Sequence, residues 1–156
     1  MEVEQKDEEI DELELEFFYS LSKLRNSISK FQPMNKVSLC EFEVLKTIYE
    51  NNKLITASKI GELIHVSKSS ISRLINVLEK IEYVRRKMKP DDRRLVHIEL
   101  TIKGEKIALK EMAYFKDISD RIISKIGYDE IKKFLVSSSN ICDVLIEEMN
   151  NDDKDI

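Results

Sequence analysis

The spacing of apolar residues changes near residue 83, and this change restricts the fold more than any other feature. Up to residue 81 the apolar residues recur every three or four positions, which is the period of an amphipathic helix. Residues 84–88 alternate from one face to the other, as a strand does, and residues 96–100 do so again beyond Pro90. The sequence therefore predicts helices followed by a β-hairpin.

A long amphipathic helix is predicted near the N-terminus. Its apolar residues recur at spacings of three or four between Ile10 and Phe31. The helix should end before Pro33, because the residue before a proline disfavours the helical conformation. We expect partner helices to cover a stripe of this length, since one small domain does not.

Helix-capping residues precede the other apolar repeats. A Ser or Thr oxygen can accept a hydrogen bond from the first turn of a helix. Gly127 is typical of a helix end and separates two further helices. The predicted caps are Ser38, which forms a capping box with Glu41, and Thr56, Ser67 and Thr101.

Charge is distributed unevenly along a chain whose net charge is −4. Residues 1–16 carry nine acids and one lysine, and residues 147–156 carry five acids and one lysine. Residues 53–110 hold 14 Lys and Arg against 7 Asp and Glu. A basic middle between acidic ends indicates a polyanionic partner.

A helix, a short turn, a second helix and a basic hairpin, in this order, are typical of a winged helix-turn-helix. Small and basic side chains on the second helix suit the major groove, because hydroxyls allow close approach while Lys and Arg reach base edges. Cations of the hairpin would contact phosphates. The predicted DNA-binding residues are Ser67, Lys68, Ser69, Ser70, Ser72, Arg73 and Asn76 on the helix, and Arg85, Arg86, Lys87, Lys89, Asp92, Arg93 and Arg94 on the hairpin.

The stretch ASKIGELIHVSKSSISRLINVLEKIEYVRRKMKPDDRRLVHIELTIKGEKI resembles the DNA-binding core of the MarR family of transcription regulators. The resemblance covers residues 38–107 and is carried by the hairpin motif Asp92-x-Arg94, by Thr101 and Gly104 after it, and by the helix start at Ser67. It implies that Asp92 pairs with Arg94, which alternation along a strand also allows. It implies as well that a hairpin arginine enters the minor groove, for which we expect Arg94.

The resemblance further implies a homodimer on a palindromic site in double-stranded DNA, with an effector cleft beside the dimerisation helices. The fold expected is mainly α with a small β-hairpin wing. Its helical dimerisation region comprises residues 1–33 and 105–150. The winged helix-turn-helix comprises residues 34–104, and residues 151–156 form a disordered acidic tail. The expected function is a regulator, in particular a repressor, released by a small aromatic or lipophilic effector. The expected cleft residues are Phe17, Leu24, Phe42, Leu45, Tyr49 and Tyr114.

The chain departs from the family pattern at Glu82, where a glycine usually follows the recognition helix. A non-glycine residue in the left-handed conformation costs about 1 kcal/mol. Either the turn adopts another conformation or the fold tolerates this cost.

Other classes of function have weaker support. No phosphate loop, metal-ligand spacing or Ser/His/Asp arrangement is visible, so we expect neither an enzyme nor a cofactor. Cys40 and Cys142 form no CxxC motif, and a redox role for Cys40 stays open. Without an 18-residue apolar run we expect no membrane span, and without a disulfide framework we expect a cytoplasmic location. The acidic ends leave one alternative, a winged helix that docks on proteins rather than on DNA.

Overall fold

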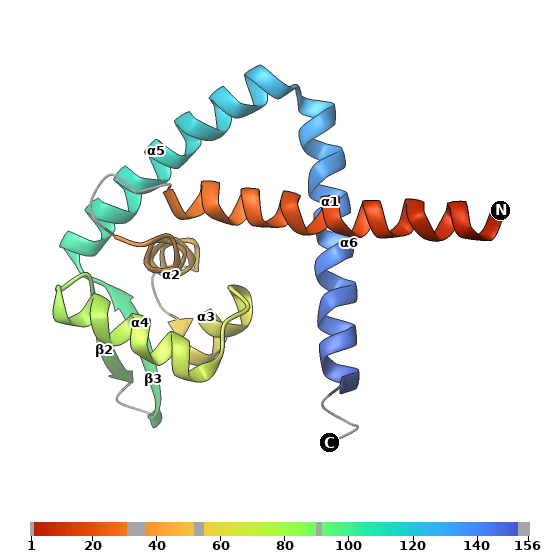
Figure 1. Ribbon diagram of the computed structural model, residues 1–156. Helices are drawn as coiled ribbons and strands as arrows, with labels where there is room; N and C mark the ends of the chain where they lie inside the picture. Colours follow the sequence, from red (N-terminus) through yellow and green to blue (C-terminus); the bar gives the residue numbers. More distant parts are fainter. Residues whose placement is uncertain (1, 31–36, 52–54, 90–91, 153–156) are drawn as a thin grey trace. The chain divides into compact units, whose positions relative to one another are not determined.

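The computed structural model describes residues 2–30, 37–51, 55–89 and 92–152 (Figure 1). The chain divides into two compact units, residues 1–111 and residues 112–156. The elements are α1 (Glu2–Lys30), α2 (Leu39–Glu50), β1 (Ile55–Thr56), α3 (Ala57–Leu63), α4 (Lys68–Lys80), β2 (Val84–Lys89), β3 (Asp92–Leu100), α5 (Ile102–Ile126) and α6 (Tyr128–Asp152). The predicted fold, mainly α with a small β wing, is confirmed.

The helix ends follow the local signals in the sequence. Helix α1 ends at Lys30, while Phe31 and Pro33 lie outside the described residues. Helix α5 ends at Ile126, and Gly127 follows with a φ of 97°, a conformation that glycine adopts without steric cost. Helix α6 continues to Asp152, so it includes the first two residues of the segment expected to be a disordered tail.

Side-chain caps begin α2, α3 and α5 as predicted. The Ser38 hydroxyl accepts from the backbone N–H of Glu41 at 3.3 Å, and a Glu41 carboxylate oxygen accepts from the N–H of Ser38 at 2.6 Å, which completes the capping box. Thr56 caps α3 by accepting from Lys59 N–H at 3.3 Å. Thr101 caps α5 by accepting from Gly104 N–H at 3.0 Å.

The sheet has three antiparallel strands in the order β1-β3-β2. In the hairpin Val84 pairs with Leu100, Arg86 with Ile98, and Met88 with Val96, so the predicted alternation is confirmed. Strand β1 was not predicted. Its two residues, Ile55 and Thr56, are too few to show a period, and their pairing with β3 is a long-range contact.

The hydrophobic core of the first unit lies between helices α2 to α4 and the sheet. Each element directs one apolar face into it, and burying one such side chain stabilises the fold by about 1.5 to 3 kcal/mol. The hairpin is anchored to this core at its base, where Val84 is buried, while Met88 on the same face of β2 is exposed. The buried apolar residues are Val37, Phe42, Val44, Leu45, Ile48, Ile55, Ile60, Ile71, Ile75, Leu78, Val84, Ile98, Leu100 and Ala108.

Candidate nucleic-acid interface

Helix α4 buries one face and exposes the other. Ile71, Ile75 and Leu78 are at most 2% exposed, which fixes the rotation of the helix against the core. The polar residues predicted for DNA contact are therefore turned outward. Lys68, Ser69, Ser72, Arg73 and Asn76 are all exposed.

Three serines at the start of α4 bond to one another. Ser67 Oγ accepts from Ser70 N–H at 3.2 Å and lies 3.0 Å from the hydroxyl oxygens of both Ser69 and Ser70. Ser67 therefore begins the helix, and its hydroxyl is already engaged. Ser72, one turn further along, is exposed on the outer face.

Arg86 connects the hairpin to α4. Its Nη1 donates to a carboxylate oxygen of Glu79, and its Nη2 donates to Asn76 Oδ1 at 2.7 Å. Two residues predicted to contact DNA thus contact each other. This bond joins residues ten positions apart on different elements, so the sequence periodicity did not indicate it.

Glu99 holds two cations on the other face of the hairpin. Its carboxylate accepts from Arg85 Nε at 2.8 Å and from Lys87 Nζ at 3.1 Å. The hydrogen bonds from Lys87 and Arg85 lower the pKa of Glu99 below its ordinary value. The register explains the cluster, because Arg85 pairs directly with Glu99 across the two strands. This carboxylate was missed in the sequence, although cross-strand pairing could have indicated it.

The tip of the hairpin is described in part. The backbones of Lys89, Asp92, Arg93 and Arg94 belong to β2 and β3, with a register shift between Met88 and Lys89. Pro90 and Asp91 lie outside the described residues, as do the side chains of Lys89 and residues 92–94. The pairing of Asp92 with Arg94 and the minor-groove role of Arg94 stay predictions.

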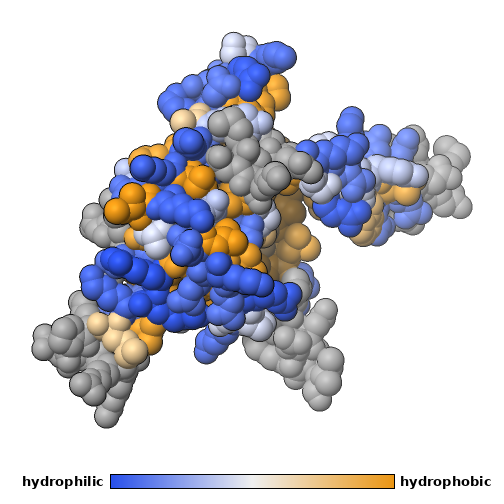
Figure 2. Space-filling view, turned by 90° about the vertical axis from the view of Figure 1, so that its left-hand side faces the viewer, coloured by the Kyte–Doolittle hydropathy of each residue, from blue (hydrophilic) through white to orange (hydrophobic). Residues whose placement is uncertain are grey.

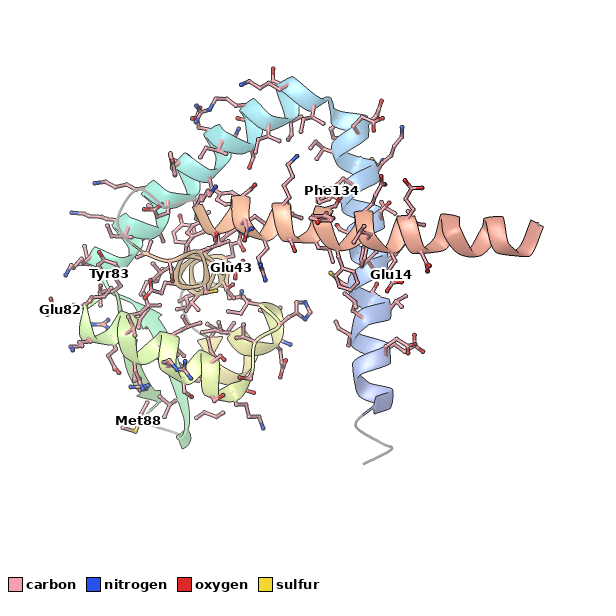
Figure 3. The ribbon with its side chains drawn as sticks, in the orientation of Figure 1. Glu14, Glu43, Glu82, Tyr83, Met88 and Phe134 are labelled. Atoms are coloured by element: carbon pink, nitrogen blue, oxygen red, sulfur yellow. The ribbon has the colours of Figure 1, made fainter. Side chains whose placement is uncertain are left out.

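The turn between α4 and β2 keeps the left-handed conformation without a glycine. Glu82 has a φ of 62°, so the fold tolerates the cost. The turn is a Schellman motif, in which Tyr83 N–H donates to Leu78 O at 2.8 Å and Glu82 N–H to Glu79 O at 3.0 Å. The Thr101 hydroxyl also donates to Glu82 O at 2.6 Å. Figure 3 shows Glu82 and Tyr83 at this turn and Met88 at the far end of β2.

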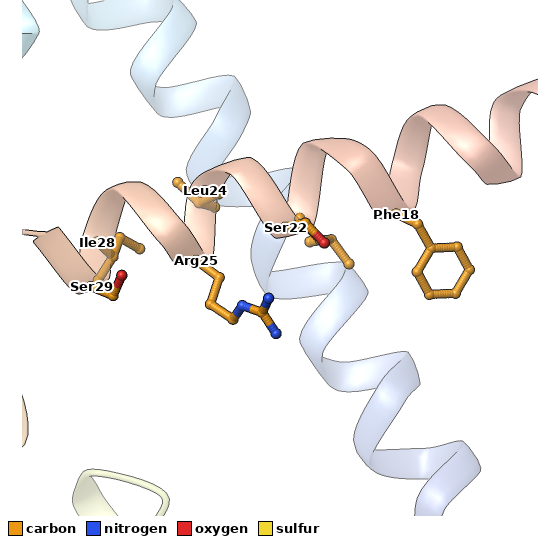
Figure 4. A pocket seen from close by; sticks show the side chains of 7 residues that line it. Phe18, Ser22, Leu24, Arg25, Ile28 and Ser29 are labelled. Carbon is orange, nitrogen blue, oxygen red and sulfur yellow. The ribbon is translucent and has the colours of Figure 1, made fainter.

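The residues predicted for an effector cleft have different surroundings. Phe42 and Leu45 are buried core residues of α2, and Tyr49 is half-buried there. Phe17 and Leu24 are partly exposed on α1, and Tyr114 belongs to the second unit. A hollow along α1 includes Leu24 but has Phe18 in place of Phe17 (Figure 4). Its lining residues are Phe18, Leu21, Ser22, Leu24, Arg25, Ile28 and Ser29.

Cys40 and Cys142 are free and exposed. His97 Nδ1 is buried without a hydrogen-bond partner, and His65 has a φ of 54° at the end of α3. Within the described ranges, no three His, Cys, Asp or Glu side chains are grouped as metal ligands would be. None of the helices described is both long enough and apolar enough to cross a membrane.

Known proteins are similar to the chain in sequence or in fold. The chain is 27% identical to the HTH-type transcriptional regulator PapX of Escherichia coli over 124 residues, which cover 76% of this chain and 73% of PapX. Its fold is similar to that of BldR from Sulfolobus solfataricus, with 24% identity, a TM-score of 0.66, and coverage of 86% and 96% of the two chains. It is also similar to S. aureus MepR in a DNA complex, with 16% identity, a TM-score of 0.73, and coverage of 83% and 97%.

The match to a family lies in the part of the chain that forms this site. The MarR family model matches residues 37–96, from the start of α2 into β3. This range contains the exposed face of α4, the turn at Glu82 and most of the hairpin. Over these residues the chain is similar to the MarR family.

Proposed function

We propose that this regulator is a homodimeric, sequence-specific repressor that binds a palindromic operator in double-stranded DNA. The observation that carries the proposal is the exposed polar face of α4 beside a basic hairpin. Ser69 and Ser72 are small enough for close approach to bases, and Lys68 and Arg73 are long donors on the same face. Such a helix fits a major groove about 12 Å wide.

The cations of the site differ in how strongly they are engaged. Among the described residues, no ion pair involves Lys68 or Arg73, so their charges are available to phosphates or bases. Arg85 and Lys87 share Glu99, but their side chains are 64% and 55% exposed. Both cations are therefore accessible to phosphates, although Glu99, whose side chain is 18% exposed, holds them more firmly than a fully exposed carboxylate would.

Exposed apolar residues on the terminal helices support a homodimer. Phe18 on α1 is 59% exposed, and Leu135 and Val144 on α6 are 59% and 57% exposed. Figure 2 shows orange apolar residues exposed among blue hydrophilic ones. Apolar faces of this length call for partner helices. Sedimentation of the full chain tests this part, since a second copy doubles the mass.

Solved relatives support DNA and a small molecule as partners. S. pneumoniae FabT was solved with DNA, and Streptomyces coelicolor PcaV was solved with its natural ligand. For this chain we propose a small aromatic or lipophilic effector that weakens DNA binding, with the hollow along α1 as a candidate site. An effector of this kind must bind the DNA-free state more tightly than the DNA-bound state. Thermal shifts with small aromatic acids, measured together with DNA affinity, test this proposal.

The test of DNA binding is selection from a pool of randomised duplexes. The proposal predicts an enriched inverted repeat whose affinity falls as salt rises. A docking module for proteins, suggested by the net charge of −4, would bind no duplex in a salt-dependent manner. Access to chromosomal DNA would require the expected cytoplasmic location.

A further inference from the structure

Arg86 occupies one side of the Asn76 amide. The Arg86 guanidinium has donors and no acceptor, so the atom that faces it must be the amide oxygen. The structure places Asn76 Oδ1 there, 2.7 Å from Arg86 Nη2. The amide nitrogen of Asn76, with its two N–H donors, is left for other partners.

Arg86 is itself held in this position. Its other terminal nitrogen donates to Glu79, which lies three residues after Asn76 and therefore on the same side of α4. Arg86 also shares a strand face with the buried Val84, which directs its side chain toward α4 rather than outward. Glu79 holds Arg86 in place, and Arg86 in turn bonds the oxygen of the Asn76 amide rather than its nitrogen.

Asn76 belongs to the face of α4 that we propose for DNA. It follows Ser72 by four residues and Arg73 by three, so the three side chains form one exposed stripe. A helix that brings Ser72 and Arg73 to DNA therefore brings Asn76 close to it as well.

We propose that Asn76 contacts DNA through its amide N–H groups, a role that rests on the proposed DNA binding. An asparagine with both atoms free can bind adenine through N6 and N7 together. The Asn76 oxygen has two lone pairs, of which Arg86 occupies one, whereas the amide N–H donors make no bond among the described residues, so we expect the side chain to select an acceptor on DNA. Acceptors on DNA are purine N7, guanine O6, thymine O4 and the phosphate oxygens. The Arg86 guanidinium bonded to this oxygen therefore disfavours the paired reading of adenine at this position.

The variant Asn76→Asp tests the donor role. Aspartate keeps an oxygen for Arg86 but removes both donors, so the fold should keep its thermal stability while affinity for the selected duplex falls about threefold to tenfold. Asn76→Ala is the matched control, because it removes the same donors without adding a negative charge. Titrations at several salt concentrations separate the added repulsion, which salt screens, from the lost hydrogen bond.

Modified duplexes identify the acceptor. If it is a base, replacing one purine per half-site with its 7-deaza analogue, or changing one base pair, weakens binding by wild type but not by Asn76→Ala. If it is a phosphate, Asn76→Ala weakens binding to all duplexes alike, and a methylphosphonate at one linkage reproduces the loss. In both cases, replacing any adenine with purine, which lacks the N6 amino group, should reduce the affinity of wild type and of Asn76→Ala by the same factor.

Two results would overturn the inference while DNA binding stands. One is unchanged affinity of both Asn76 variants for the selected duplex. The other is an adenine whose N6 amino group matters to wild type but not to Asn76→Ala, which shows paired reading. If wild type binds no duplex, the proposed DNA binding itself fails. This outcome is distinct from the two results above, in which wild type binds DNA but the role of Asn76 is wrong.

Discussion

The first turn of α5 lies directly against the backbone carbonyl of Tyr83. A Cβ atom at position 104 would lie 1.8 Å from Tyr83 O, and Tyr83 O also accepts from Thr101 N–H at 3.0 Å. Only glycine permits this approach between the helix and the start of the hairpin. The requirement explains in physical terms why a glycine follows Thr101 at this spacing.

The variant Gly104→Ala should therefore unfold more easily than wild type. The clash is with backbone atoms, which cannot rotate away, so we expect a loss of about 2 to 3 kcal/mol in the free energy of unfolding. Urea denaturation measures it. Lys106→Ala, an exposed change in the same helix, is the control and should alter stability by less than about 0.5 kcal/mol.

Replacing Glu82 with glycine should stabilise the protein. Glycine relieves the left-handed strain, and we expect a gain of about 1 kcal/mol in the free energy of unfolding. The ion pair with Lys103 that is lost has an N–O distance of 3.7 Å, and the Glu82 side chain in it is 81% exposed, so it contributes little. Glu82→Ala removes the same ion pair without relieving the strain. Equal stabilities of the glycine and alanine variants would show that strain at this turn is not the cause.

The carboxylate of Glu99 should make stability depend on pH in the acidic range. Its pKa is lowered by Lys87 and Arg85, so it stabilises the fold above its ordinary value of 4.5, and this contribution is lost as pH falls through the lower folded value. Glu99→Gln should be less stable at neutral pH and show a flatter decline below pH 4.5.

The Glu43 carboxyl on α2 should make stability depend on pH in the opposite direction from Glu99. Burial raises its pKa, so its contribution to stability is present below 4.5 and is lost as pH rises through the raised folded value. Glu43→Gln should therefore be more stable than wild type at neutral pH. Thermal melts at several pH values test both variants. If Glu99→Gln and Glu43→Gln change the melting temperature in the same direction at neutral pH, the opposite pKa shifts assigned to Glu99 and Glu43 are contradicted.

Lys87→Ala should weaken binding to all duplexes alike. Its ammonium would neutralise a phosphate, so the slope of log affinity against log salt should decrease in magnitude by about one. Lys132→Ala removes the same charge from α6 and serves as the control. An unchanged slope for Lys87→Ala would remove Lys87 from the interface.

Local signals predicted most of the elements, and long-range contacts account for what was missed. Ser38, Thr56 and Ser67 cap their helices as expected, because capping involves residues three positions apart. The two-residue strand β1 and the bond between Arg86 and Asn76 depend on segments that only the folded chain brings together. The exposed face of α4 was predicted from helical periodicity, but its internal hydrogen bonds were not.

Sequence-specific reading by α4 is tested most directly through Arg73. The affinity of wild type and of Arg73→Ala for the selected duplex and for a scrambled duplex can be measured by fluorescence anisotropy at one salt concentration. A paired contact to a base contributes about 1 to 3 kcal/mol, so Arg73→Ala should lose roughly tenfold or more on the selected duplex and much less on the scrambled one. Equal losses on both duplexes, or no loss on either, would contradict base reading by this face of α4.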